Sequence, residues 1–221
     1  MPNQMSFKSP ELLSYLVPAG PVQKMRSGVG NLASYKAPNI HLKPMTVAFP
    51  CAPMPPMSGA GAPSCKLTLQ FDGAAADLTE DHKILADLLR DTDAKAIDYI
   101  VANSKAFFPK KKNLPSAATI KEMYTPSLKD KSDQYNPLFS AKVAFKGDAE
   151  NYEITVPCFN ADREQVPGVM ALAKGSEVTA VIEPAYLWSI SGKFGITWRL
   201  KKALVHKMGS EDTTFDFDLF E

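Results

Sequence analysis

Residues 194–207 alternate apolar and polar side chains over an unusually long stretch. Apolar residues hold the even positions from 194 to 200, and Arg199 and Lys201 stand opposite. A period of two predicts a strand with one buried face. The phase then slips, because Ala203 and Val205 are apolar at odd positions, and the slip predicts a bulge near 201–203. Long, bulged strands are typical of small coiled barrels.

Shorter segments with strand character precede this one. The predicted strands are residues 40–49, 66–71, 140–146, 152–158, 177–183 and 185–190. Pro44 lies inside the first segment and indicates either an edge strand or a bulge. Gly192 lies in the short link 191–193 and predicts a tight hairpin between the last two strands.

One region has helical periodicity. Between residues 78 and 106, apolar side chains recur at i, i+1, i+4 and i+5, with charged residues on the other face. The pattern predicts a helix that covers a sheet, and Thr92 and Asp93 mark a point where it could divide in two. The fold class predicted from these elements is mainly β with an inserted α-helix. Within that class we expect an OB-fold, a small closed β-barrel that binds nucleic acid on one face.

Composition divides the chain into three segments. Residues 1–39 are rich in Pro and Gly, and we expect an N-terminal extension that either lies on the body or stays mobile. Residues 40–208 hold the predicted strands and helix, with a Pro-rich loop at 50–64. Residues 209–221 form an acidic tail that contains aromatic residues.

The net charge of +1 conceals an uneven distribution. The tail holds five of the 24 acidic residues and none of the 25 basic ones, so residues 1–208 carry a charge of +6. Within that body the excess lies in residues 105–207, which hold 16 basic and 10 acidic side chains. A basic second half is therefore followed by an acidic end.

Targeting and cofactor signals are absent from the sequence. No apolar run approaches the roughly 20 residues of a membrane span, and the N-terminus lacks a signal-peptide pattern. We therefore expect an intracellular protein that is not secreted and has no membrane partner. Cys51, Cys65 and Cys158 have no C-x-x-C spacing and do not cluster with the histidines. This arrangement predicts reduced thiols, no metal and no cofactor.

Motifs of common enzyme classes are also missing. The sequence lacks G-x-x-x-x-G-K-[ST], G-x-G-x-x-G ahead of a helix, G-x-S-x-G, and H-x-E paired with C-x-x-C. The acidic residues of the body do not pair into a two-metal site. We therefore expect a protein that is not an enzyme and has no catalytic residues.

The second half interleaves basic residues with aromatic ones. Single-stranded nucleic acid requires this combination, because cations neutralise phosphates and flat rings stack on bases. The candidate DNA-binding residues are Lys110, Lys111, Lys112, Tyr124, Lys129, Lys131, Tyr135, Lys142 and Lys146. Residues 110–112 could equally form a solvated loop, and Phe107 and Phe108 are expected to anchor the end of the helix.

The two tryptophans lie on neighbouring predicted strands. Trp198 lies on the apolar face of its strand and is expected in the core. Trp188 shares a face with Tyr186 and Ile190. The sequence leaves open whether that face is the barrel interior or a binding groove.

Several motifs in this half resemble a known family. G-K-F-G-I-T-W occupies 192–198, preceded by K-G-S-E-V at 174–178 and by Y-x-P-x-x-K at Tyr124, Pro126 and Lys129. Over about residues 40–221 the chain resembles the phage-type single-stranded DNA-binding proteins of large DNA viruses of algae (phycodnavirus-like). The resemblance implies an OB-fold, sequence-independent binding in DNA replication, recombination and repair, and an acidic tail that contacts proteins. Here the tail ends in Glu221 rather than Phe.

The resemblance also implies roles for individual residues. Carried onto matching positions, the DNA contacts would be Tyr124, Lys129, Trp188, Lys193, Arg199 and Lys201. The protein-interaction tail would comprise Glu211, Asp212, Phe215, Asp216, Phe217, Asp218, Phe220 and Glu221.

The leading hypothesis is a viral single-stranded DNA-binding protein, acting at the site of viral DNA replication in the nucleus or cytoplasm. Its tail would compete with DNA and recruit DNA polymerase and primase or helicase, and the chain would work alone or as a homodimer. The alternative is a non-enzymatic structural or assembly protein of a virion, with the barrel as a packing module. An RNA-binding regulator is a third hypothesis, although the sequence has no ribonucleoprotein-type aromatic motif.

Overall fold

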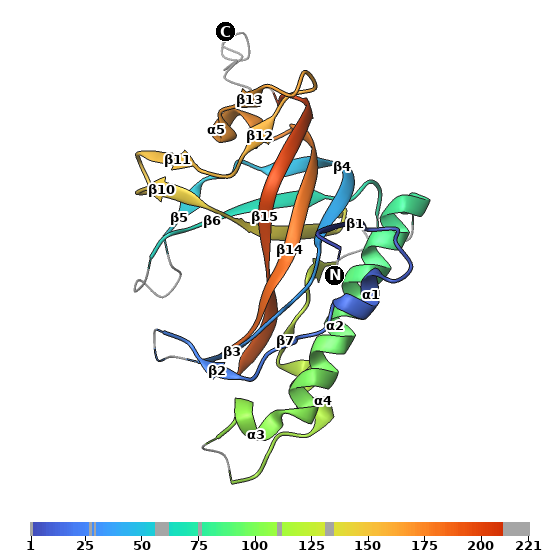
Figure 1. Ribbon diagram of the computed structural model, residues 1–221, viewed down its shortest axis with the longest axis vertical. Helices are drawn as coiled ribbons and strands as arrows, with labels where there is room; N and C mark the ends of the chain where they lie inside the picture. The colour runs from blue at the N-terminus through green and yellow to red at the C-terminus, as the bar shows by residue number, and fades with distance from the viewer. Residues whose placement is uncertain are drawn as a thin grey trace, which may run out of the picture.

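The structure is a computed structural model that describes residues 2–26, 28, 30–55, 62–74, 77–109, 112–130 and 135–209. It is mainly β, as the sequence predicted (Figure 1). The helices of the described residues are α1 (Leu12–Tyr15), α2 (Glu80–Ala102), α3 (Ser104–Phe107), α4 (Ala117–Glu122) and α5 (Gly168–Ala171).

Five strands pair in a ring around the main core. They are β4 (Asn39–Phe49), β6 (Ser64–Gln70), β9 (Leu138–Val143), β14 (Glu177–Ile190) and β15 (Lys193–Lys207). The pairings run β4–β6–β9–β15–β14 and return to β4, and all are antiparallel except that of β9 with β15. Pro44 lies inside the ring of strands, beside a register shift between β4 and β14, so it marks a bulge rather than an edge.

The β14–β15 pair is the longest in the ring and contains the predicted bulge. Val181 pairs with Lys202 while Ile182 pairs with Leu200, so Lys201 is the extra residue. The predicted division into strands 177–183 and 185–190 is wrong, because β14 is continuous there. A second register shift leaves Ala185 as the extra residue and changes the phase of the alternation at this point.

Short strands extend or decorate the ring. They are β1 (Gln4–Ser6), β2 (Gln23–Lys24), β3 (Asn31–Ser34), β5 (Pro53–Met54), β7 (Tyr124–Thr125), β8 (Leu128–Lys129), β10 (Phe145–Gly147), β11 (Tyr152–Ile154), β12 (Cys158–Phe159) and β13 (Gln165–Val166). The loop predicted at 50–64 contains β5, which pairs with β6.

Two predicted strands are each divided in the structure. Residues 140–146 end their pairing in the ring at Val143, and Lys146 belongs to the separate β10–β11 hairpin. That hairpin turns at Gly147, with φ of 97°, and at Asp148, whose side chain accepts two backbone N–H groups. Residues 152–158 divide into β11 and β12, because the chain leaves the hairpin to pair with β15.

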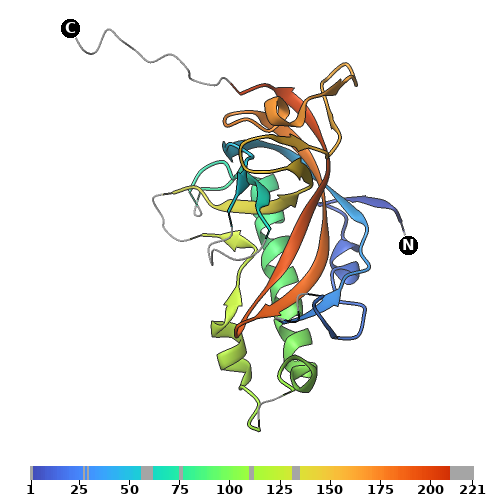
Figure 2. The same ribbon diagram turned by 90° about the vertical axis from the view of Figure 1, so that its left-hand side faces the viewer.

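The long helix links the main core to a second cluster of buried side chains. α2 continues through Thr92 and Asp93, and the chain divides instead at Asn103, before α3. Its first half packs on the ring, and its second half packs in a cluster that contains Phe107 and Phe194. Figures 1 and 2 show the helix lying beside the ring and following the β14–β15 hairpin toward α3 and α4.

The N-terminal segment lies on this body. β1 pairs in parallel with β4, and Leu12 and Leu16 are buried in the main core. β3 pairs with β14 over residues 186–189, and β2 pairs with β3. Of the two alternatives predicted for residues 1–39, the described residues show the first, a segment packed on the body.

None of the helices in the described residues is long and apolar enough to cross a membrane. Cys51, Cys65 and Cys158 are buried free thiols, as the sequence predicted, and the sulfurs of Cys51 and Cys65 lie 2.9 Å apart.

Candidate nucleic-acid interface

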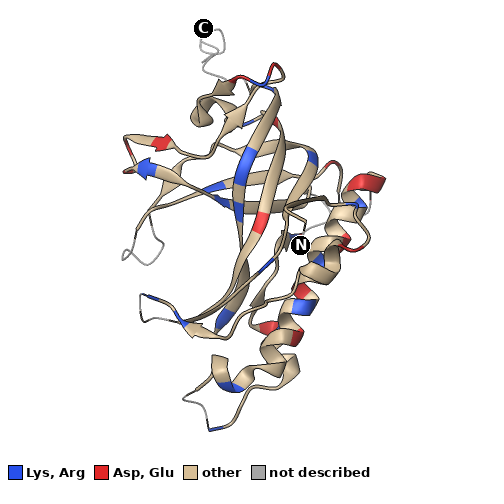
Figure 3. Ribbon diagram, viewed as in Figure 1, with Lys and Arg blue, Asp and Glu red and all other residues tan. Residues whose placement is uncertain are grey.

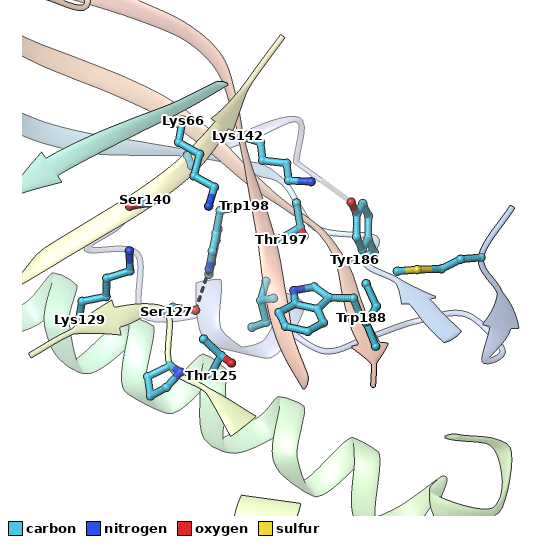
Figure 4. Close-up of a pocket in the computed structure, with 15 residues that line it drawn as sticks. Lys66, Thr125, Ser127, Lys129, Ser140, Lys142, Tyr186, Trp188, Thr197 and Trp198 are labelled. Carbon is cyan, nitrogen blue, oxygen red and sulfur yellow. Dashed lines mark hydrogen bonds between the residues drawn. The ribbon is translucent and has the colours of Figure 1, made fainter. Parts of the chain in front are cut away.

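A hollow of about 310 Å³ lies where the outer surface of β6, β9, β14 and β15 meets the chain that follows α4 (Figure 4). We call this hollow the groove. Lysines of β6, β8 and β9 line one side of it, and aromatic side chains of β14 line the other. Its walls therefore bring together segments that lie far apart in the sequence.

Three basic side chains stand in a row across neighbouring strands at the groove. Lys66 of β6 pairs in register with Lys142 of β9, and Lys142 pairs with Arg199 of β15. Like charges placed directly opposite each other destabilise a sheet. The row ends at Glu183 of β14, the register partner of Arg199. A bound anion would relieve the repulsion within the row.

Lys129 of β8 adds a fourth cation from the segment that follows α4. The pKa of Lys66 is lowered by burial and then by the charges of Lys129 and Lys142. Among the ion pairs of the described residues, none involves these three lysines. Figure 3 shows Lys and Arg on the central strands, where β14 also carries acidic residues, and both signs of charge along α2. The groove therefore holds uncompensated positive charge.

Trp188 and Tyr186 form the aromatic side of the groove and are half-buried. Trp188 pairs across the hairpin with Gly195, where an added Cβ would lie 2.8 Å from Cζ2 of the indole. The missing side chain thus lets the ring lie close against the neighbouring strand. The guanidinium of Arg199 lies 5.7 Å from the ring centroid of Tyr186, within the range of a cation–π contact. A cation and two rings are therefore already side by side in the free protein.

Trp198 has a different environment although it touches the same groove. It is 2% exposed and packs edge-on against Phe139, with ring centroids 5.6 Å apart. Its indole N–H donates to the Ser127 hydroxyl at 2.9 Å. The prediction that Trp198 is a core residue is confirmed.

Tyr124 corrects the sequence prediction. We expected its ring to stack on DNA, but it is only 8% exposed and lies in the second cluster of buried side chains. Its hydroxyl donates to Oδ1 of Asp93 at 2.8 Å, and burial raises the pKa of the phenol well above its usual range. The ring packs within this cluster, so little of its surface is open to a base.

No protein-family model matches the sequence, and no curated protein matches it. Among solved structures, the single-stranded DNA-binding protein gp2.5 of bacteriophage T7 aligns with a TM-score of 0.51 at 14% identity, covering 80% of this chain and 96% of that chain. The two chains have a similar fold. The single-stranded DNA-binding protein of bacteriophage Enc34, solved with single-stranded DNA, aligns with a TM-score of 0.49 at 18% identity, covering 91% and 98%.

Apart from the buried Tyr124, the predicted DNA-binding residues divide into three groups. Lys129, Lys142 and Trp188 line the groove, and Arg199 lies beside it. The residues that are exposed but do not line the groove are Lys112, Tyr135, Lys146, Lys193 and Lys201. Lys110, Lys111, Lys131 and the tail residues from 210 onward lie outside the described residues.

Lys201 and Lys146 differ from the other exposed candidates in their surroundings. Lys201 lies 3.4 Å from Oε1 of Glu183, so its charge is already paired. Lys142 and Lys146 both belong to the predicted strand 140–146, but the interruption after Val143 places Lys146 in the β10–β11 hairpin.

Sequence reasoning missed several residues that line the groove, chiefly Lys66, Tyr186 and Met25. Lys66 was visible as a polar position of an alternating strand, and Tyr186 as a residue on the same face as Trp188. Met25 had no such signal, because it reaches the groove through the pairing of β2 with β3 and of β3 with β14.

Proposed function

We propose that this chain binds single-stranded DNA in the groove without reading its sequence. The observation that carries the proposal is the row of Lys66, Lys142 and Arg199 beside the rings of Tyr186 and Trp188. Cations bind phosphates through charge, and aromatic rings stack on any base. The similar fold of gp2.5, itself a single-stranded DNA-binding protein, supports the proposal.

We assign the ring of β4, β6, β9, β15 and β14 to the OB-fold. The pairing order, the single parallel contact and the bulged long hairpin support a small closed barrel of this type. In this assignment the groove lies on the outer face of the barrel, and Met25, which follows β2, contributes to its lining.

The proposed binding mode uses the two sides of the groove for two parts of the strand. The lysine side takes successive phosphates, and the rings of Tyr186 and Trp188 take the unstacked bases. A duplex keeps its bases stacked inside, so it can use the cations but not the rings. Carboxylates, histidines and cysteines do not line the groove in the described part of the chain. We therefore assign it a binding role and no catalytic step.

Fluorescence anisotropy with labelled oligo-dT tests this function. We expect tight binding at about 50 mM salt and affinity that falls steeply as salt rises, because bound phosphates release counterions. Duplex DNA of the same length should bind more weakly, and an RNA oligonucleotide shows whether the sugar matters. Equal affinity for duplex and single strand, or no salt dependence, would contradict the proposal.

The acidic tail has a second part in this proposal. Its carboxylates and rings mimic phosphates and bases, so a tethered tail competes with DNA for a groove, in its own chain or in a second copy. DNA then displaces the tail and leaves it free to recruit DNA polymerase and primase or helicase, in viral replication and recombination. Deleting residues 209–221 should tighten oligo-dT binding several-fold at low salt and abolish recruitment. Unchanged or weaker DNA affinity after deletion would contradict the competition.

A further inference from the structure

A buried carboxylate lies behind the groove, in the middle of α2. Asp93 is 7% exposed, and burial raises the pKa of its carboxyl, although hydrogen bonds from Ser127 and Tyr124 partly oppose the rise. Removing a carboxylate from water is unfavourable unless hydrogen bonds replace its hydration. An apolar residue would cover the sheet without that cost, so the position of Asp93 needs a reason beyond packing.

The hydrogen bonds that Asp93 accepts from described residues come from one segment, 124–127. The Tyr124 hydroxyl donates to Oδ1 at 2.8 Å, and the Ser127 hydroxyl donates to the same oxygen at 2.7 Å. The backbone N–H of Ser127 donates to Oδ2 at 2.8 Å. The Ser127 hydroxyl in turn accepts the indole N–H of Trp198. One carboxylate thus connects the helix, this segment and β15.

The segment held in this way forms a wall of the groove. Thr125, Ser127 and Lys129 line the hollow, and β7 pairs in parallel with β15 at Phe194 and Gly195, beside Trp188 (Figure 4). The distance between this segment and β15 therefore determines the width of the groove and the position of the Lys129 ammonium.

We propose that Asp93 is a positioning residue for single-stranded DNA, which fixes the wall 124–129 without touching the ligand. This inference rests on the proposed function of the groove. An ionised carboxylate can accept three donors at once, whereas an amide of the same shape has only one acceptor oxygen. In Asp93→Asn, an amide NH₂ would replace one of these acceptor oxygens, and a donor of Ser127 or Tyr124 would lose its partner.

The pH dependence separates positioning from a purely structural role. The titratable groups that face Asp93 are the phenols of Tyr124 and Tyr35, and both have raised pKa values and stay neutral. Because the carboxyl pKa is raised, Asp93 takes up its proton at a higher pH than an ordinary Asp. Its protonation favours the folded state over the unfolded one, so this group adds stability as the pH falls. Protonation of Asp93 also removes acceptors for the donors of residues 124–127, so DNA affinity should fall over the same pH range.

The test compares Asp93→Asn with Asp91→Asn, an exposed residue of the same helix that undergoes the same charge change. At neutral pH we expect about tenfold weaker oligo-dT binding for Asp93→Asn, with faster dissociation, and unchanged binding for Asp91→Asn. The affinity of the wild-type protein for oligo-dT should fall as the pH is lowered and Asp93 is protonated. The affinity of Asp93→Asn should not show this fall. If Asp93→Asn fails to fold, Ser127→Ala removes the hydroxyl that joins Asp93 to Trp198, keeps the backbone N–H bond to Asp93, and should weaken binding several-fold. If Asp93→Asn and Ser127→Ala both bound oligo-dT with the affinity and the pH profile of the wild-type protein, the inference would be overturned.

Amide hydrogen exchange separates this inference from the proposed function. Exchange at residues 127–129 should be faster in Asp93→Asn, or in Ser127→Ala if that variant is used, than in Asp91→Asn, with or without DNA. If the wild-type protein bound no oligo-dT, the proposed function would fail, and so would the DNA role of Asp93. Unchanged protection of the wall would show that the carboxylate does not hold it, whatever the DNA result.

Discussion

Trp188 and Trp198 lie on paired strands and border the same groove, yet their surroundings differ. Trp198 is buried, packs against Phe139 and has a hydrogen-bonded indole N–H. Trp188 is half-buried and lies over Gly195, on the aromatic side of the groove. The Trp198 side chain packs in the main core, whereas the Trp188 side chain lines the groove with part of its surface exposed.

Strand phase produces this difference. The extra residue at Ala185 sets the phase in which Tyr186 and Trp188 share the outer face with Glu183, while Leu187 stays buried. In β15 the alternation runs without interruption from Phe194 to Leu200, which keeps Trp198 inside. Residue type alone therefore does not separate an aromatic ring that faces the groove from one in the core, but the position of a bulge does.

The largest expected effect is on the buried ring. Trp198→Ala should lower the free energy of unfolding by about 3–5 kcal/mol, because it removes a large buried side chain and leaves the Ser127 hydroxyl without its donor. Thermal or urea denaturation measures the change, and Trp188→Ala is the matched control. An unchanged melting temperature for Trp198→Ala would show that the strand faces are assigned wrongly.

The next effect concerns the cations beside Trp188. The combined Ala variant of Lys66, Lys142 and Arg199 should weaken oligo-dT binding about 100-fold at low salt and reduce the salt slope by about two, as expected for three lost phosphate contacts. Loss of like-charge repulsion should leave the fold at least as stable.

The control for the row removes three exposed lysines that do not line the groove, Lys83, Lys105 and Lys207. It changes the net charge by the same amount. Equal losses of affinity in the two variants would show that total charge, rather than the row, attracts DNA.

A smaller effect is expected for the exposed ring itself. Trp188→Ala should cost about 1–3 kcal/mol of binding to oligo-dT and leave the melting temperature nearly unchanged, since a base loses its stacking partner. Trp188→Phe should recover part of the affinity, because it restores a flat ring. If Trp188→Ala destabilised the protein as much as Trp198→Ala, the contrast between the two rings would disappear.

The sequence was sufficient for features that depend on local periodicity. It predicted the bulge at Lys201, the buried face of Trp198, the long helix and the role of Phe107 and Phe108, which pack on Phe194. Each follows from alternation or from an apolar stripe within one segment. The mainly β class with an inserted helix was predictable for the same reason.

The site was less predictable because it depends on contacts between distant segments. Tyr124 has the sequence context of an exposed ring, between a helix and a Pro-containing segment, but a carboxylate 31 positions earlier binds its hydroxyl. Lys66 joins the groove only because β6 pairs with β9. Met25 reaches it through an N-terminal segment whose role the sequence left open. Strand register and tertiary hydrogen bonds decide these three positions, and neither is encoded in local periodicity.

The smallest effect is expected for a substitution at Gly195, which lies against the indole of Trp188 and leaves that ring itself unchanged. In Gly195→Ala the new methyl group would lie 2.8 Å from Cζ2 of the indole and 3.3 Å from the Thr125 carbonyl oxygen. The indole can swing outward because it borders the groove, so we expect a small change in stability and about two- to fivefold weaker oligo-dT binding. Gly20→Ala is the control, since its nearest neighbour would lie at 3.9 Å. Wild-type affinity in Gly195→Ala would mean that bases do not use the ring in this position, even if Trp188→Ala weakened binding.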